Sequence, residues 1–384
     1  MSLFRRREAT ITGPDGLIPP RGGKRSAAPV TNDDAMRHSA VWAALRLRAD
    51  LISTMPVDVY RRIQGVQVEV PKPPILISPG GAQVDMQEWL YSTQVDLDRA
   101  GNCFGLITER NALGLPARIE LLALSDVSVR ATGSQITEVR ISGKPYDPAD
   151  VWHEKQYTVA GLPLGLSPVA YAAFSLRESL SAQQFALDWF GGSAIPMAEL
   201  KNTAKTINKR DAEIARDAYR AAVSTGDLFV HGNDWEYRPI QTVAASSEFL
   251  ESRRFGLGEA ARFFGVPSDL IDAVVAGASV TYANIGQRNL QLLIMNLGPA
   301  VTRRERALSR LVAGGRYVKL NRNALLAMDP QTRAATVKVQ LDSRVLTPTE
   351  ARALDERPPL TDADLAEFDR VYGTPRTTPT EATA

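Results

Sequence analysis

The chain has 384 residues, enough for two or three packed units, and its 45 lysines and arginines nearly balance its 43 acidic residues, leaving a net charge of +2. This balance argues against a protein that grips nucleic acid tightly through counterion release. The single cysteine, Cys103, excludes an intrachain disulfide framework and a zinc site of several cysteines, and we expect it to be packed in the interior. The N-terminus lacks the apolar run of a signal peptide, and no stretch is long and apolar enough to span a membrane.

The two ends of the chain show no apolar periodicity. Residues 1–32 and 372–384 are dense in Gly, Pro and Thr and are predicted to be flexible tails. Between them, residues 38–56 carry a helical apolar stripe that stops before Pro56, and alternating residues then predict a strand. From 101 to about 157, short β-like runs such as NCFGLITER and PARIELLAL are separated by Gly, Pro and Asp. These patterns predict a mixed α/β domain for the first part of the body.

A long helix and a small insert are predicted next. The helix, at 167–192, opens with Ser167 as N-cap and Pro168 at the first helical position, and it closes on two glycines. The insert, at about 195–240, is expected to hold the helix NKRDAEIARDAYRAA and two strands, LFVH and WEYRPI, joined by a turn. This organisation predicts a small α/β unit between two long helices.

The second long helix begins near residue 246 and has a well-specified end. Gly265 can adopt the left-handed conformation that closes helices, and Pro267 prevents continuation. Two glycines inside the helix, Gly256 and Gly258, weaken it, which indicates either a kink or the close approach of a neighbouring backbone.

A soft, nearly uncharged loop, VAGASVTY, follows this helix, and a long amphipathic helix is predicted after it at 283–312. The pair Gly298–Pro299 is expected to bend that helix. The apolar positions expected on one side of it are Leu290, Leu293, Ile294, Leu297, Val301, Leu308 and Leu311.

Motifs that carry catalysis are missing or incomplete. GLGEAA at 256–261 copies a dinucleotide fingerprint, but it lies inside a helical stripe where the motif requires a preceding strand. WHEKQY at 152–157 lacks the second histidine of a zinc protease motif, and no GxxxxGK[ST] phosphate-binding loop occurs. We therefore predict no catalytic residue, no metal site and no cofactor, with His153 an ordinary strand residue.

Three segments together resemble the portal proteins of long-tailed bacteriophages. They are ESRRFGLGEAARFFGVPSDLI, then SVTYANIGQRNLQLLIMNLGPAVTRRERALSRLV, and near the C-terminus LTPTEARALDERPPL. The resemblance covers about residues 41–360. It implies an α+β portal fold, with an α/β wing, a two-helix stem, a small α/β clip, a tunnel loop and a long wing helix, assembled as an oligomeric ring.

The resemblance also implies a division of the chain into parts. Their expected bounds are a tail at 1–32, the first part of the wing at 33–166, the first stem helix at 167–192, the clip at 193–241, the second stem helix at 242–266, the tunnel loop at 267–282, the returning helix at 283–313, a wing or crown-side segment at 314–371 and a second tail at 372–384. Little sequence is left for a crown, so a crown-based function is not expected.

A portal protein forms a ring, usually of twelve subunits, at one capsid vertex, and double-stranded DNA is packaged and ejected through it. The partners that the resemblance implies are the major capsid protein, the terminase large subunit, a head-tail adaptor and the passing DNA, with no membrane. The protein would lie in the virion, and in the host cytoplasm during assembly. The near-neutral charge suits a channel, because many lysine and arginine contacts would hold the DNA back.

Individual residues follow from this mapping. The resemblance implies a tunnel loop near the DNA made of Ala276, Gly277, Ala278, Ser279, Val280, Thr281 and Tyr282. It places Glu251 and Arg254 on the channel side of the stem. The charged clip surface would comprise Arg210, Asp211, Arg216 and Asp227. The aromatic residues Phe174, Trp189 and Phe190 are candidates for contact between subunits or for burial within one.

Two other classes of function stay open at this stage. The chain could be a phage-encoded enzyme with an unrecognised active site, which Glu154, Asp269 or Asp272 could serve. It could also be a monomeric adaptor that binds only protein. A large ring distinguishes the portal from both.

Overall fold

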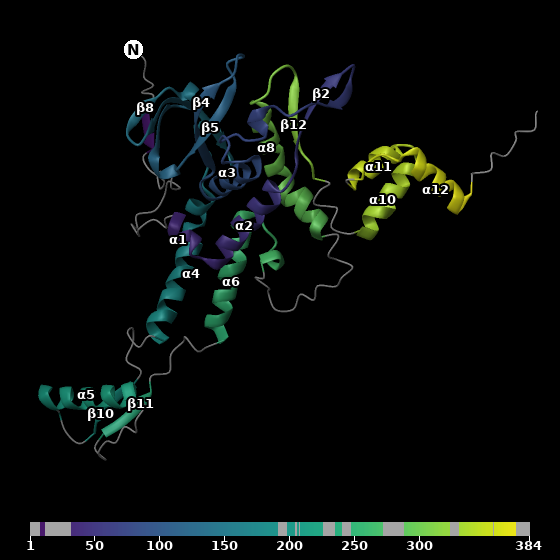
Figure 1. Ribbon diagram of the computed structural model, residues 1–384. Helices are drawn as coiled ribbons and strands as arrows, with labels where there is room; N and C mark the ends of the chain where they lie inside the picture. Colours follow the sequence, from purple (N-terminus) through teal and green to yellow (C-terminus); the bar gives the residue numbers. More distant parts are fainter. Residues whose placement is uncertain are drawn as a thin grey trace, which may run out of the picture. The chain divides into compact units, whose positions relative to one another are not determined.

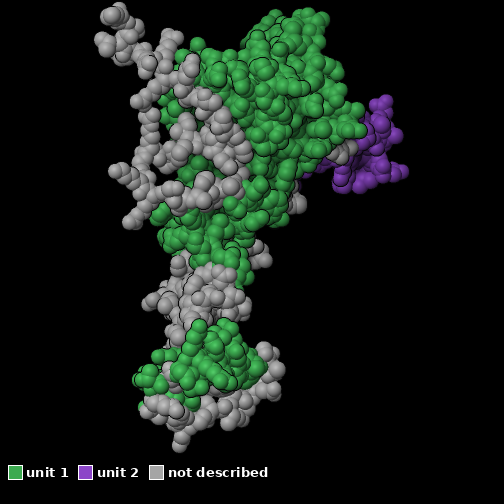
Figure 2. Space-filling view, turned by 90° about the vertical axis from the view of Figure 1, so that its left-hand side faces the viewer, with its two compact units in different colours: residues 1–320 green, residues 321–384 purple. Residues whose placement is uncertain are grey.

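The computed structural model describes residues 8–11, 32–190, 198–203, 206, 208–225, 235–239, 247–271, 288–322, 330–355 and 357–373. They fall into two compact units, 1–320 and 321–384, coloured separately in Figure 2. The described part of unit 1 combines helices with small antiparallel sheets, and that of unit 2 is helical. The predicted α+β class is therefore confirmed.

Among the described residues, the first half of unit 1 holds three α-helices and most of the strands (Figure 1). The helices are α1 (Asn32–Met36), α2 (Ser39–Ser53) and α3 (Met86–Ala100). The strands are β1 (Glu8–Ile11), β2 (Val57–Ile63), β3 (Val66–Glu69), β4 (Asn102–Arg110), β5 (Pro116–Leu122), β6 (Val127–Thr132), β7 (Gln135–Ile141), β8 (Lys144–Tyr146) and β9 (Val151–Lys155). The predicted helix before Pro56, the strand after it and the short strands beyond residue 101 are confirmed.

These strands form three small sheets. One has the order β1-β6-β7-β8, another β5-β4-β9, and the third is β12-β2-β3, in which β12 (Arg316–Leu320) joins from the far end of unit 1. In the third sheet Val318 lies opposite Val59 and Leu320 opposite Val57, so the buried residues of both strands share one face.

Helix α3 is absent from the elements predicted above, although its two ends carry clear signals. The Asp85 carboxylate accepts a hydrogen bond from the amide of Glu88 at 2.8 Å, and Gly101 closes the helix with φ 72°. Between these ends, the side chains of Trp89, Leu90 and Leu97 are fully buried. The helix forms because its caps define both ends and its apolar face packs in the interior.

The centre of the chain holds the two predicted long helices, α4 (Pro168–Phe190) and α6 (Ser247–Phe264). Between them lie α5 (Lys209–Thr225) and the strands β10 (Ala198–Asn202) and β11 (Trp235–Pro239), which pair antiparallel. The predicted strand WEYRPI is confirmed as β11. Its described partner is β10, which the pattern did not predict, and the predicted strand LFVH lies outside the described residues.

The last helix of unit 1 departs from the predicted regular stripe. Residues 288–291 are helical, Leu292–Leu297 form a π-helix, and α8 continues over Gly298–Ser309. Leu297 is buried as predicted, but Leu290 and Ile294 are 45% and 56% exposed, so their placement in the apolar face was wrong. The π-turn holds more residues than an α-turn and rotates the preceding side chains away from the stripe. Its place directly before Pro299 fits the carbonyl clash that proline causes.

The described part of unit 2 contains the helices α10 (Pro330–Asp342), α11 (Pro348–Leu354) and α12 (Asp362–Tyr372). Thr347 and Glu350 form a complete capping box at the start of α11, and Thr361 and Asp364 form another at the start of α12. Their helices are thus well defined by local sequence. None of the described side chains of this unit is buried.

Candidate ring, channel and clip surfaces

The two long helices of the centre pack against each other, and α2 joins them. They share one core, and its buried side chains include Val41, Leu45, Val169, Leu176, Ala260 and Phe264. A Cβ added to Gly256 of α6 would lie 3.1 Å from the hydroxyl of Ser179 on α4. That hydroxyl also lies 2.8 Å from Nε2 of the buried His38. The neighbour of Gly256 is thus a side chain and not the neighbouring backbone that was expected, and nothing lies within 4 Å of a Cβ built on Gly258. The described parts of α2, α4 and α6 form a packed bundle (Figure 1).

Both helix-end predictions are confirmed. At the start of α4, the Ser167 hydroxyl accepts a hydrogen bond from the amide of Ala170 at 3.1 Å. At the end of α6, Gly265 has φ +62°, its amide donates to the Arg262 carbonyl, and the Val266 amide donates to the Ala261 carbonyl at 3.0 Å. These two bonds form a Schellman motif, which fixes where α6 stops and the following segment leaves.

The segment that joins α6 to the last helix of unit 1 is anchored at both ends. Residues 272–287, with all seven tunnel-loop candidates and Asp272, lie outside the described residues. On its two sides Asp269 pairs with Arg288, and the side-chain Nδ2 of Asn296 donates to the Gly265 carbonyl at 2.7 Å. The start and the return of the segment are thus tied to the end of α6.

A buried ion pair joins α8 to strand β9 of the β5-β4-β9 sheet. Arg304 donates from Nη1 to Glu154 of β9 at 2.7 Å and from Nη2 to the Thr93 hydroxyl of α3 at 2.6 Å. The two charged side chains are 0% and 4% exposed. Burial raises the pKa of Glu154, and the adjacent guanidinium opposes that rise. The guanidinium also lies over the ring of Trp89, 5.6 Å from its centroid. Three elements far apart in sequence therefore depend on one arginine.

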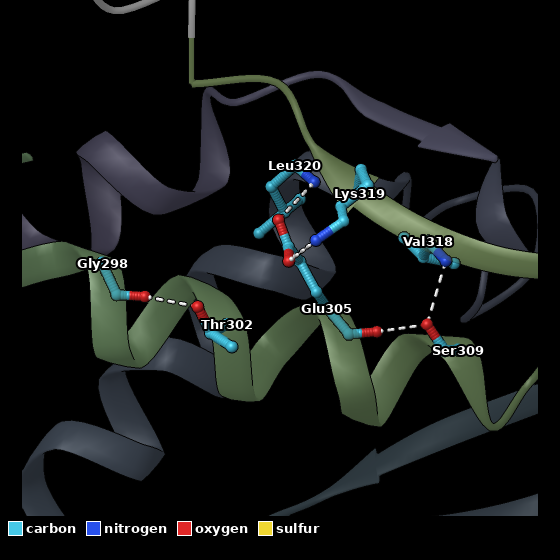
Figure 3. A network of polar contacts seen from close by, with 7 residues as sticks. All are labelled: Gly298, Thr302, Glu305, Ser309, Val318, Lys319 and Leu320. Atoms are coloured by element: carbon cyan, nitrogen blue, oxygen red, sulfur yellow. Dashed lines mark hydrogen bonds and ion pairs between the residues drawn. The ribbon is translucent and has the colours of Figure 1, made fainter. Parts of the chain in front are cut away.

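A second set of polar contacts holds strand β12 against α8 (Figure 3). The Glu305 carboxylate accepts from the backbone amide of Leu320 at 3.2 Å and from the ammonium of Lys319 at 2.8 Å. The Ser309 hydroxyl donates to the Glu305 carbonyl and accepts from the amide of Val318 at 2.9 Å. A helix and a strand are thereby fixed in one register.

His153 lies in strand β9, as predicted, and its side chain is partly buried. Its ring stacks on Phe104 with centroids 4.4 Å apart, and Nε2 lies 3.1 Å from Oδ1 of Asn102. Burial, together with the nearby charge of Lys155, lowers the pKa of His153 to about 3. The neutral ring is a packing residue here.

Three of the four charged residues proposed for the clip surface are described, and their side chains are exposed. Arg210, Asp211 and Arg216 are all exposed on α5. The carboxamide of Asn208 caps the helix by accepting from the Asp211 amide at 2.9 Å. Asp227 lies outside the described residues.

Apolar side chains are exposed along the described faces of the central helices. Phe174 of α4 is 84% exposed and Tyr171 is 44% exposed, while Phe255 of α6 is 59% exposed. The alternative that Phe174 is buried within one subunit is therefore wrong. The side chains of Trp189, Phe190, Glu251 and Arg254 lie outside the described ones.

Two of the three residues considered for an enzyme, Glu154 and Asp269, have arginine partners, and Asp272 lies outside the described residues. Burial raises the pKa of the Cys103 thiol well above its ordinary value. Within the described ranges, no group of three or more His, Cys, Asp or Glu could hold a metal ion. Among the described helices, none is long and apolar enough to cross a membrane.

A family model for phage portal proteins matches residues 39–356. The chain belongs to the phage portal protein family. This portal chain is 27% identical over 364 residues to the probable portal protein of Streptomyces phage phiC31. The alignment covers 88% of this chain and 78% of the phiC31 protein. It is 25% identical over 354 residues to the portal protein of Enterobacteria phage HK97. This alignment covers 88% of this chain and 82% of the HK97 protein.

Solved structures share the fold. An HK97 family phage portal protein from Corynebacterium diphtheriae matches with TM-score 0.60 and 20% identity, over 79% of this chain and all of that one. A chain from the neck of a native gene transfer agent particle, computed with C12 symmetry, matches with TM-score 0.57 and 19% identity, over 90% and 97% of the chains. The predicted portal fold is confirmed.

Proposed function

We propose that this chain forms the ring at a single capsid vertex through which double-stranded DNA is packaged and later ejected. The observation that carries the proposal is the family match over residues 39–356, which includes the paired helices α4 and α6 and the small α/β unit between them. The C12 symmetry of the similar neck structure favours twelve subunits. The role is structural and not enzymatic.

The parts of the chain take roles within this ring. Residues 33–166 and 314–371 contribute to the wing and its crown side, α4 and α6 form the stem, and 193–241 forms the clip. The exposed Phe174 then offers contact area to a neighbouring subunit, because aromatic side chains are enriched in the buried centres of protein interfaces.

The proposed partners follow from the same roles. The wing meets the major capsid protein, and the clip meets the terminase large subunit during packaging and a head-tail adaptor afterwards. Arg210, Asp211 and Arg216 supply exposed charge for these contacts on α5. The protein is made and assembled in the host cytoplasm and ends in the virion.

The segment from Ala276 to Tyr282 is proposed to touch the moving DNA. No lysine or arginine occurs between Asp269 and Gln287, so each subunit would offer hydroxyl groups and small side chains without a strong phosphate anchor. The tethers at Arg288 and Asn296 support this placement, because they hold the two ends of the segment at the end of α6.

Negative-stain electron microscopy and native mass measurement of the purified protein test the proposal. A ring with a central hole and a mass of about twelve subunits is the expected result. A uniform monomer would contradict the ring and would favour an adaptor that binds only protein.

A further inference from the structure

The sheet formed by β12, β2 and β3 extends beyond the core that covers its inner part. Val57 and Val59 of β2 are buried, whereas Arg61 and Ile63, the next residues on the same face, are exposed. All four residues of β3 are exposed as well. Figure 1 shows this hairpin at the margin of unit 1. The outer part of the sheet is therefore open to a partner.

Apolar side chains gather on one face of this outer part. The two-residue turn Gln64–Gly65, with φ 50° and 84°, joins the strands and sets Ile63 opposite Val66. Directly opposite residues point to the same face, and so do residues two apart on one strand. Ile63, Val66 and Val68 thus form one patch, the hairpin patch, and they are 48%, 63% and 39% exposed. The patch continues the buried face of the sheet outward.

Two arginines beside the hairpin patch repel each other. Arg61 of β2 lies directly opposite Arg316 of β12 on the same face, and both side chains are exposed. Like charges at directly opposite positions destabilise a sheet. Neither side chain has an ion pair or hydrogen bond with any described residue. A carboxylate from a partner would relieve this repulsion.

The two edges of the sheet differ. At the β12 edge, the outward amides are bonded to side chains of α8. At the β3 edge, the Val70 amide donates to the Val59 carbonyl of β2 at 2.9 Å, and bonded residues alternate with outward-facing ones along an antiparallel strand. The amides of Gln67 and Glu69 therefore point away from β2, where an added strand can pair with them.

We propose that β3, in the wing of the ring proposed above, is extended by a strand of the major capsid protein that carries a carboxylate between apolar side chains. The added strand bonds to the outward amides of β3, and its apolar side chains cover Val66 and Val68. A glutamate opposite Val68 then lies two strand spacings, about 10 Å, from Arg61, a separation that the two long side chains span together. The carboxylate draws Arg61 away from Arg316.

The surroundings of the arginines favour this occupant over others. The apolar side chains between Arg61 and the open edge gain nothing from a phosphate backbone, which argues against DNA. A second β3 edge is a poor partner too, because this face of the three strands carries no carboxylate. The capsid protein is the partner assigned to the wing, so the inference rests on the proposed function.

Photocrosslinking tests the identity of the partner. p-Benzoylphenylalanine replaces Gln67, whose side chain lies on the face opposite the hairpin patch and leaves the patch intact. The full chain is co-expressed with the major capsid protein of the same phage, and the assembled particles are irradiated. The expected product joins the ring subunit to a capsid-protein segment that holds Asp or Glu. A product with another copy of this chain, or no product in assembled rings, would overturn the proposal.

Two charge reversals on β2 separate the contact from the fold. Arg61→Glu places a carboxylate opposite Arg316, so its rings should melt no lower than the parent rings. Their binding of purified capsid protein should nevertheless weaken by about tenfold or more. Arg62→Glu makes the same change of charge on the opposite face of β2 and should leave binding nearly unchanged. Equal weakening by both variants, or none by Arg61→Glu, would contradict the proposal.

The outcomes also distinguish this inference from the proposed function. Rings that bind capsid protein equally well with Arg61 and with Glu at this position would overturn the strand contact and leave the ring intact. A failure of the parent chain to form rings would remove the proposed function and this contact with it.

Discussion

Replacing Glu154 by alanine removes one partner of a buried ion pair and leaves the other in place. The Arg304 guanidinium is 0% exposed and would keep only the Thr93 hydroxyl as a hydrogen-bond partner. Breaking such a pair costs about 3–5 kcal/mol of unfolding free energy, because a buried charge is left without compensation. One kcal/mol shifts the melting temperature of a unit of 150–250 residues by about 2–4 °C, and unit 1, with residues 1–320, belongs at the lower end, so the melting temperature should fall by roughly 6–10 °C.

Two further variants separate charge from packing. Glu154→Gln keeps an acceptor oxygen near Arg304 and should lose about 1–2 kcal/mol. The double variant Glu154→Leu with Arg304→Met removes both charges and should melt within a few degrees of the parent. Trp89 and Trp152, whose rings lie 4.8 Å apart beside the pair, report local unfolding through their fluorescence.

The reasoning fails under either of two results. Glu154→Ala protein that melts within 1 °C of the parent would show that Arg304 does not need its carboxylate. A double variant no more stable than Glu154→Ala would show that lost packing, and not the unpaired charge, caused the damage.

Three other changes have defined outcomes. His153 has a pKa near 3 in the folded chain and 6.5 in the unfolded chain, so the unfolded state binds more protons between these two pH values. The free energy of unfolding should therefore fall by up to a few kcal/mol as the pH drops from 6.5 to about 3. In urea titrations His153→Phe should flatten this pH dependence. Ala278→Lys should leave rings intact but slow packaging, since each subunit adds a cation near the phosphates. The neutral change Ala278→Gln should not slow packaging. An unchanged yield of filled heads for both variants would contradict the placement of the loop in the channel. Gly265→Ala should lower the free energy of unfolding by about 1 kcal/mol, because φ at this residue is +62°. Gly258→Ala, in open space within α6, should raise it by a similar amount. Thermal melts that reverse this order would contradict the helix-end assignment.

The parts of the fold that local rules control were predictable. Ser167 before Pro168 marked the start of α4, and Gly265 before Pro267 marked the end of α6, because caps depend on residues close in sequence. Helix α3 carried the same kind of signal in Asp85 and was overlooked. Capping rules applied throughout the chain would have found it.

Contacts between distant segments were not predictable from spacing. Glu154 and Arg304 are 150 residues apart, and nothing in either local pattern identifies the other as its partner. The exposure of Ile294 was missed for a different reason. A 3.6-residue period was assumed for a helix that becomes a π-helix at Leu292–Leu297, so the side of the helix that each residue occupies changed. The candidate loop residues rest on the family resemblance alone.

The contacts between α8 and β12 protect a sheet edge against pairing with another chain. Strand β12 is the outer strand of its sheet, and such strands offer free amide groups with which another chain can pair. Here the amides of Val318 and Leu320 are already occupied by Ser309 and Glu305 of the same chain. Uncontrolled pairing of sheets between newly made subunits is thereby discouraged along this edge. Ser309→Ala would uncover one of the two amides.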